Sequence, residues 1–255
     1  MYFAVLSKGK VKTVIIMAIV MLITCLGVYF SGAQQVFFGY AVKKLPIYRV
    51  QTESKKVAIS FDCAWGVDYT DKLLDIMAEH GVKCTFFMVE FWAKKYPEYV
   101  KKISEHGHEI GTHSATHPHM SKLDKNAMVK ELTTSKKVIE EITGKKVELF
   151  RPPFGEYNDL LIDVAEELEL YTIQWDVDSL DWKDLSSAQI EKRVTERVKN
   201  GSIVLFHNQG LHTAEALEGI ITTLKNKGYE FVSIGELIYR DNYHVAPDGA
   251  QVKNS

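Results

Sequence analysis

From Lys56 onward the chain alternates short apolar segments with amphipathic ones, and this alternation constrains the fold more than any other feature. Segments rich in β-branched and aromatic residues predict strands at 57–61, 84–89, 108–112, 147–150, 171–175, 202–206 and 229–233. Apolar residues at helical spacing predict helices at 70–80, 92–106, 125–143, 157–168, 187–199 and 213–227. About seven strands alternating with helices favour an α/β fold, an irregular, closed or nearly closed (β/α) barrel of parallel strands. We expect residues 56–240 to form this domain and residues 241–255 to be a loose, flexible tail.

The N-terminal segment is built differently. Three lysines within residues 1–12 are the only charges before Lys43, and the apolar segment 13–31 is long enough to cross a bilayer as a helix. Basic residues stay in the cytoplasm, so we expect a cytoplasmic stub, a membrane anchor, a stalk at 32–55 and an extracytoplasmic domain. A cleaved signal sequence is the alternative, because small residues permit cleavage after Ala33, which would secrete the domain.

Composition and charge exclude several classes of protein. Hydrophobic residues at 46% and charged residues at 25% are ordinary for a globular chain. The formal net charge of −2 gives no basic face, so we expect no nucleic-acid partner. Cys25, Cys63 and Cys84 are too few for a disulfide framework. Without its N-terminal lysines the chain is acidic, so we expect it to find its substrate through a shaped groove rather than by charge. For a membrane-tethered domain the expected state is a monomer.

Polar residues follow five of the predicted strands: Asp62, the pair His113 and His117, Arg151, the pair Asp178 and Asp181, and His207. In a parallel barrel the residues beyond the carboxyl ends of strands converge on one rim, so these side chains form a candidate site. Two neutral imidazoles suit Zn²⁺ or Co²⁺. An ionised Asp62 can accept a proton from water and a protonated His207 can return one. The set predicts metal-assisted hydrolysis.

The same residues lie, in order, in five motifs that resemble those of the polysaccharide deacetylases, the NodB-homology group or carbohydrate esterase family 4. The resemblance covers roughly residues 55–240, and its motifs are Phe61-Asp62, His113 to His117, Arg151-Pro152-Pro153-Phe154-Gly155, Asp178-Ser179-Leu180-Asp181-Trp182 and Leu205-Phe206-His207. It implies an irregular (β/α) barrel. It also implies hydrolysis of N-acetyl groups on glycan amino sugars, and we expect the substrate to be an envelope glycan, peptidoglycan.

The resemblance implies a role for each matching residue. Asp62 would be the catalytic base oriented by Arg151, and His207 the acid tuned by Asp181. His113 and His117 would bind a divalent metal, Zn²⁺ before Co²⁺. Trp182 and Leu205 would line a pocket for the acetyl methyl, and the backbone N–H near Phe154 would stabilise the oxyanion. Apart from the resemblance, Tyr157 could stack on a sugar of the substrate, although packing is at least as good an interpretation.

Cys63 departs from the family pattern, because it stands where the family has its third metal ligand, an aspartate. The resulting Asp-x-x-Trp-Gly form resembles the sporulation-associated PdaB-like branch. Either a Cys63 thiolate completes a His₂Cys site, or Cys63 packs in the core and the metal is held weakly. The second reading leaves a catalytically weak, glycan-binding or structural spore-envelope protein as the alternative function. A chitin-oligosaccharide deacetylase would share the same chemistry.

Overall fold

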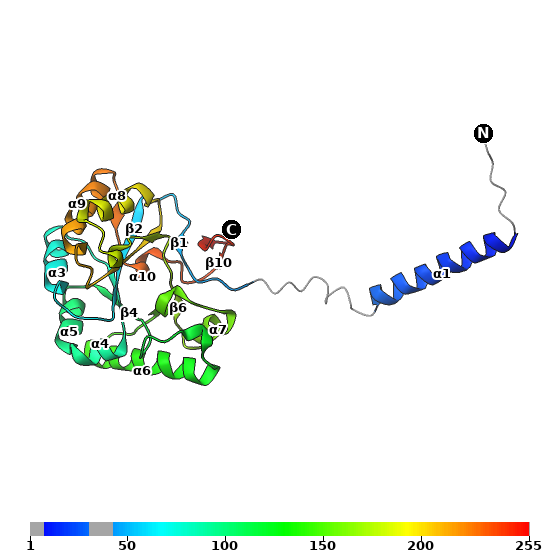
Figure 1. Cartoon of the computed structure of the whole chain (residues 1–255), viewed down its shortest axis with the longest axis horizontal. Coiled ribbons are helices and arrows are strands. Elements are labelled where there is room, and N and C mark those ends of the chain that lie inside the picture. Colours follow the sequence, from blue (N-terminus) through cyan, green and yellow to red (C-terminus); the bar gives the residue numbers. More distant parts are fainter. Residues whose placement is uncertain (1–7, 31–42, 255) are drawn as a thin grey trace. The chain divides into compact units, whose positions relative to one another are not determined.

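The computed structural model describes residues 8–30 and 43–254, and the chain divides into two compact units, with the boundary in the sequence between Lys43 and Lys44 (Figure 1). The first unit contains helix α1 (Lys8–Phe30). Its segment Gly9–Gly27 is long and apolar enough to cross a membrane. Most of the expected cytoplasmic stub, the cleavage position after Ala33 and residues 32–42 of the expected stalk lie outside the described residues.

The second unit is a curled, mainly parallel sheet with helices around it (Figure 1). Strands β8-β2-β3-β4-β5-β6 are parallel neighbours, in that order. Strand β7 pairs with β8, at the other end of this series. The strands are β1 (Arg49–Val50), β2 (Lys56–Cys63), β3 (Thr85–Met88), β4 (Glu109–Thr112), β5 (Leu149–Phe150), β6 (Tyr171–Thr172), β7 (Val177–Asp178), β8 (Ser202–His207), β9 (Glu230–Phe231), β10 (Tyr243–Val245) and β11 (Ala250–Lys253).

The predicted strand 171–175 is in fact the segment that closes the barrel. Ile173 N donates to Phe150 O of β5 at 2.8 Å, whereas Asp176 N donates to Ile203 O of β8 at 3.2 Å. The chain therefore changes partner within a few residues: β6 covers only the start of the predicted strand, and β7 begins two residues after its predicted end. The change joins the two ends of the parallel series, and the predicted irregular barrel is confirmed.

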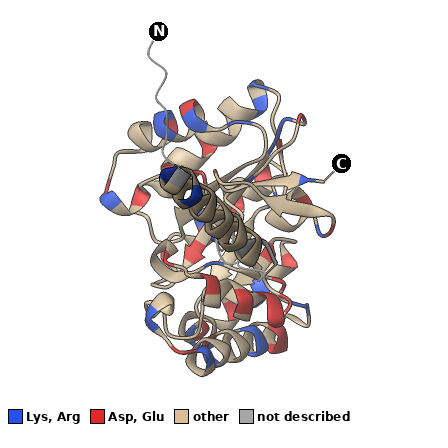
Figure 2. Ribbon diagram, turned by 90° about the vertical axis from the view of Figure 1, so that its right-hand side faces the viewer, with Lys and Arg blue, Asp and Glu red and all other residues tan. Residues whose placement is uncertain are grey.

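The helices follow the predicted alternation with one division and one addition, the short helix α10. They are α3 (Thr70–Glu79), α4 (Glu90–Lys95), α5 (Pro97–Glu105), α6 (Lys125–Thr143), α7 (Asp159–Glu167), α8 (Ser187–Arg197), α9 (Thr213–Asn226) and α10 (Ile234–Leu237). The predicted helix 92–106 is two helices because Pro97 lacks an N–H and begins a new helix. Basic and acidic residues are interspersed on the side of the second unit shown in Figure 2, which provides no broad basic face there.

The two faces of β2 enter different environments, because side chains alternate along a strand. Val57, Ile59, Phe61 and Cys63 belong to the large apolar cluster that the sheet shares with the helices. Ala58 belongs to a second cluster with residues of β5 and β8, inside the barrel. Asp62 shares the face of Ala58, so its carboxylate points to the interior at the carboxyl end of the strand.

The domain is longer at both ends than the sequence predicted. At its start, Ile47 is buried and bridges Ile173, so the expected stalk ends before this residue. At its end, β10 and β11 form an antiparallel hairpin, and β11 pairs with β1. The Gln251 side chain bonds both the N–H and the carbonyl of Tyr239, each at 2.8 Å, which ties the hairpin to the domain. Residues 243–253 are therefore part of the sheet, and the prediction of a loose tail was wrong.

Candidate active site

Asp62 and Arg151 form a buried ion pair at the carboxyl ends of β2 and β5. Asp62 is 6% exposed and Arg151 is fully buried. Arg151 Nη1 donates to Asp62 Oδ1 at 2.8 Å, and the guanidinium carbon lies 4.2 Å from the centre of the Phe87 ring. Burial would raise the pKa of Asp62, but the charge of Arg151 holds that pKa below its ordinary value. Asp62 is thus ionised at neutral pH and can accept a proton.

His113 and His117 follow β4 and come together beside this pair. His113 Nδ1 lies 2.7 Å from the carbonyl oxygen of Arg151, to which it donates. His113 Nε2 therefore faces Asp62, with 3.5 Å to Oδ2, and the two imidazole centres are 4.9 Å apart. Burial lowers the pKa of both histidines, to about 4 for His113. Both rings are neutral near pH 7, which is the form of imidazole that binds metals.

The loop that carries these histidines is held by Glu131 of α6. Glu131 accepts hydrogen bonds from Ala115 N at 2.9 Å, Thr116 N at 2.8 Å and Thr116 Oγ1 at 2.7 Å. Ser114 and His117 adopt left-handed φ angles of 71° and 57°. Such backbone persists only where its surroundings hold it, so Glu131 stabilises the loop. Its position in the middle of a later helix gave no sequence signal for this contact.

His207 and Asp181 form a second hydrogen-bonded pair next to the first. His207 ends β8, and in the register of the sheet it lies directly opposite Asp62 of β2. His207 Nδ1 is 2.8 Å from Asp181 Oδ1, and Asp181 Oδ2 also accepts from His207 N at 2.8 Å and Thr213 Oγ1 at 2.7 Å. Burial would lower the pKa of His207, but Asp181 raises it above its ordinary value. His207 can therefore hold a proton at the edge of the site.

The residues expected to contact substrate differ in how accessible they are. Trp182 and Phe154 are 55% and 58% exposed. The Phe154 ring also packs against His117 and His119, with 4.6 Å between ring centres in each case. Leu205 is 3% exposed in β8. Tyr157 is partly buried, and its hydroxyl lies 3.1 Å from that of Tyr48, so it also packs within the domain.

Cys63 does not join the two histidines. It lies on the opposite face of β2 from Asp62, fully buried in the apolar cluster. Burial raises the pKa of its thiol well above the ordinary value, which disfavours the thiolate that binds metals. Within residues 8–30 and 43–254, no group of three or more His, Cys, Asp or Glu side chains is placed to hold a metal. Of the two interpretations of Cys63, the geometry favours the core residue over the His₂Cys ligand.

The donors present fit a divalent cation only in part. Neutral imidazoles whose second nitrogen is fixed by a carbonyl are ligands that Zn²⁺ and Co²⁺ favour, and His113 has this arrangement. Catalytic zinc sites commonly use three protein ligands. His113 and His117, whose ring centres are 4.9 Å apart, would supply two of them, and no third His, Cys, Asp or Glu joins them within the described part of the chain.

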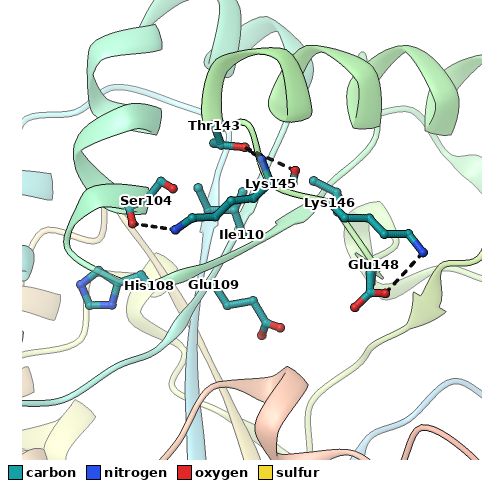
Figure 3. Close-up of a pocket in the computed structure, with 9 residues that line it drawn as sticks. Ser104, His108, Glu109, Ile110, Thr143, Lys145, Lys146 and Glu148 are labelled. Carbon is teal, nitrogen blue, oxygen red and sulfur yellow. Dashed lines mark hydrogen bonds and ion pairs between the residues drawn. The ribbon is translucent and has the colours of Figure 1, made fainter.

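The cavity shown in Figure 3 is separate from this site. It lies at the amino ends of β4 and β5, where α5 and α6 end, and Ser104, His108 and Lys145 are among its lining residues. Lys145 Nζ donates to the carbonyl of Ser104 at 3.0 Å, so this lysine ties α5 to the segment after α6. Because catalytic residues of parallel barrels lie at the carboxyl ends of strands, we do not assign this cavity to the candidate site.

Comparison with known proteins identifies the class. A family model described as polysaccharide deacetylase matches residues 49–173. A peptidoglycan-N-acetylglucosamine deacetylase of Bacillus cereus is 34% identical over 75% of this chain and 92% of its own length. The chain belongs to the polysaccharide deacetylase family.

Other similar proteins differ in their described activity. The uncharacterized protein YlxY of Bacillus subtilis (strain 168) is 38% identical over 76% of this chain, which spans 60% of the length of YlxY. The crystal structure of BA3943 from Bacillus anthracis, described as a pseudoenzyme of carbohydrate esterase family 4, is 37% identical. It aligns with a TM-score of 0.73 over 75% of this chain and 68% of its own. A mutant of BA3943 is described as having restored enzymatic activity.

Proposed function

We propose that this chain hydrolyses N-acetyl groups on the amino sugars of peptidoglycan, releasing acetate and leaving a free amine. The observation that carries the proposal is the pair of acid–base couples, the buried Asp62 with Arg151 and the partly exposed His207 with Asp181, whose reactive members lie opposite each other on β2 and β8. One couple favours an ionised carboxylate and the other a protonated imidazole. Membership of the family supports the reaction class.

In the proposed mechanism, Asp62 removes a proton from water as the water oxygen bonds to the amide carbonyl carbon. Backbone N–H near Phe154 stabilises the oxyanion that results. The carbon–nitrogen bond then breaks, and His207 gives its proton to the leaving amine. A divalent cation, Zn²⁺ or Co²⁺, held by His113 and His117 would polarise the carbonyl when bound. The absence of a third protein ligand among the described residues leads us to expect weak metal binding.

We further propose that α1 anchors the chain in a membrane, with the second unit, residues 44–255, extracytoplasmic and monomeric. The length and composition of α1 support this placement, and a wall glycan would be reached on that side. The Asp-x-x-Trp-Gly sequence at 62–66 supports a sporulation-related role.

A catalytically weak, glycan-binding or structural envelope protein is the second candidate. Two observations favour it: Cys63 faces the core rather than the histidines, and a similar solved structure is described as a pseudoenzyme. The complete acid–base set supports the enzyme, because a binding protein has no chemical need for an ionised Asp62 beside a protonated His207.

Acetate release from N-acetylated peptidoglycan strands separates the two candidates. The full chain in detergent is assayed with Zn²⁺, with Co²⁺ and with a chelator. The enzyme predicts metal-dependent release that is lost in His207→Gln and retained in the matched control His244→Gln, an exposed histidine of β10. Release from chitin oligosaccharides but not from peptidoglycan would indicate the chitin-active alternative. No release by folded protein with either metal would leave the glycan-binding function.

A further inference from the structure

Trp65 is an exposed aromatic side chain close to the acid–base couples that the proposed mechanism does not use. It follows Asp62 by three positions and is 66% exposed. Single exposed apolar residues are common on proteins, so exposure alone does not indicate a ligand. The structure of the loop around Trp65 provides the further evidence.

The loop is fixed through one carbonyl. Gly66 O accepts from Trp92 Nε1 at 2.7 Å and from Asn208 Nδ2 at 3.1 Å. Trp92 belongs to α4, and Asn208 directly follows His207. Gly66 has a left-handed φ of 49°, a conformation that glycine adopts at little cost. Two elements of the domain therefore hold the loop, and Trp65 is presented to solvent from a supported backbone.

A second aromatic ring extends the surface. The centres of Trp65 and Phe91 are 5.6 Å apart with an interplanar angle of 43°, and Phe91 is 37% exposed. Phe91 follows Glu90, whose N–H donates to Ser114 O at 3.0 Å in the loop that carries the histidines. The two rings thus adjoin both the strand that carries Asp62 and the loop between His113 and His117.

We propose that Trp65 and Phe91 form a platform that binds a sugar ring of the glycan strand, adjacent to the ring whose N-acetyl group is hydrolysed. The proposal rests on the proposed function for the class of substrate. The C–H face of an uncharged pyranose packs against the negative face of an aromatic ring while its hydroxyls stay in water. Such a contact needs no counter-charge, which suits an acidic domain. A glycan with at least two rings can therefore contact both the reacting position and the platform, whereas a monosaccharide cannot, so the platform favours binding of longer glycans.

The test measures binding of tetra-N-acetylchitotetraose and of N-acetylglucosamine to the full chain by calorimetry. His207→Gln is the background, so that the sugar is not consumed. Trp65→Ala should raise the Kd for the tetramer roughly tenfold, which corresponds to about 1.4 kcal/mol. Trp65→Phe should raise it less, because an aromatic face remains. The matched control is Leu160→Ala, an apolar side chain of α7 that is also exposed.

The monosaccharide separates the platform from the rest of the site. Its Kd should change less than twofold in Trp65→Ala, since one ring occupies the reacting position. An equal Kd for the tetramer in Trp65→Ala and the background would overturn the proposal, as would failure of every chain to bind the tetramer. The binding assay needs no turnover, so the two proposals can fail separately. If the native chain releases no acetate but tetramer binding still depends on Trp65, the platform is supported and only the deacetylase is refuted.

Discussion

The buried pair of Asp62 and Arg151 allows a quantitative test of how the site is held together. At 2.8 Å, two unit charges attract by about 6 kcal/mol at an effective dielectric constant of 20. Much of this attraction is offset by the loss of hydration, because Arg151 is fully buried. Removing one partner strands the other charge, so Arg151→Met should lower the free energy of unfolding by about 3–5 kcal/mol. Asp62→Asn should have a comparable effect.

The double variant is the decisive measurement. With both charges gone, neither is stranded, and the combined loss should be smaller than the sum of the single losses by about 2–3 kcal/mol. Urea unfolding followed by tryptophan fluorescence reports this unit, because all four tryptophans follow Lys44. A chelator removes any contribution of bound metal. Additive losses, or a loss below about 1 kcal/mol in Arg151→Met, would refute the electrostatic account of the pair.

The pH dependence of the same variants has a definite sign. In the native chain the lowered pKa of Asp62 stabilises the fold above the unfolded pKa of about 3.9, and this contribution is lost as pH falls through the folded value. Without Arg151, burial raises the pKa of Asp62, so protonation relieves the stranded charge. As pH falls from neutral to 5, the free energy of unfolding of Arg151→Met should therefore rise toward that of the native chain. An unchanged difference across that range would contradict this reasoning.

Three further predictions concern single contacts. Asp181→Asn should lower the pKa of His207, because the carboxylate that opposes the effect of burial is gone. The alkaline limb of the pH profile of acetate release should therefore move to lower pH, and a histidine titration by NMR should show the same shift. A pH profile identical to that of the native chain would exclude Asp181 as the group that tunes His207. Cys63→Ala should leave Zn²⁺ affinity within about twofold by calorimetry, because the thiol faces the core; loss of binding would restore Cys63 as a ligand. Glu131→Gln should destabilise the unit by about 1–3 kcal/mol in urea, since a charged acceptor of three hydrogen bonds becomes a neutral one; unchanged stability would mean that the loop holds itself.

The sequence predicted which side chains lie close together at the site, but it did not predict toward which side of its strand Cys63 points. Asp62 and His207 could be predicted to converge because each ends an apolar strand, and the structure places them opposite each other. The orientation of Cys63 depends on where β2 ends. A strand that ended at Phe61 would have left Cys63 in a loop, free to turn toward His113, whereas β2 continues through Cys63. Strand ends are set by pairing with neighbouring strands, which local sequence does not contain.

Backbone strain is the other property that the sequence did not predict, and four of the seven non-glycine residues with left-handed φ in the described part of the chain lie at the site. Ser114, His117, Phe154 and Leu180 are non-glycine residues with φ between 57° and 71°, and all four lie within the motifs that follow the strands. Each such residue costs on the order of 1 kcal/mol relative to a relaxed backbone. A domain that needed only to fold could place glycine at these positions at lower cost. The strain is therefore best explained by what the side chains and their neighbours do there: His117 joins His113, and Leu180 directly precedes the aspartate that holds His207. The same reasoning extends to Glu131, whose three hydrogen bonds offset part of the cost of the histidine loop. Strain of this kind gathers at active sites and at ligand clamps alike, so it marks this rim as the functional part of the domain, and the acid–base couples rather than the strain favour the enzyme.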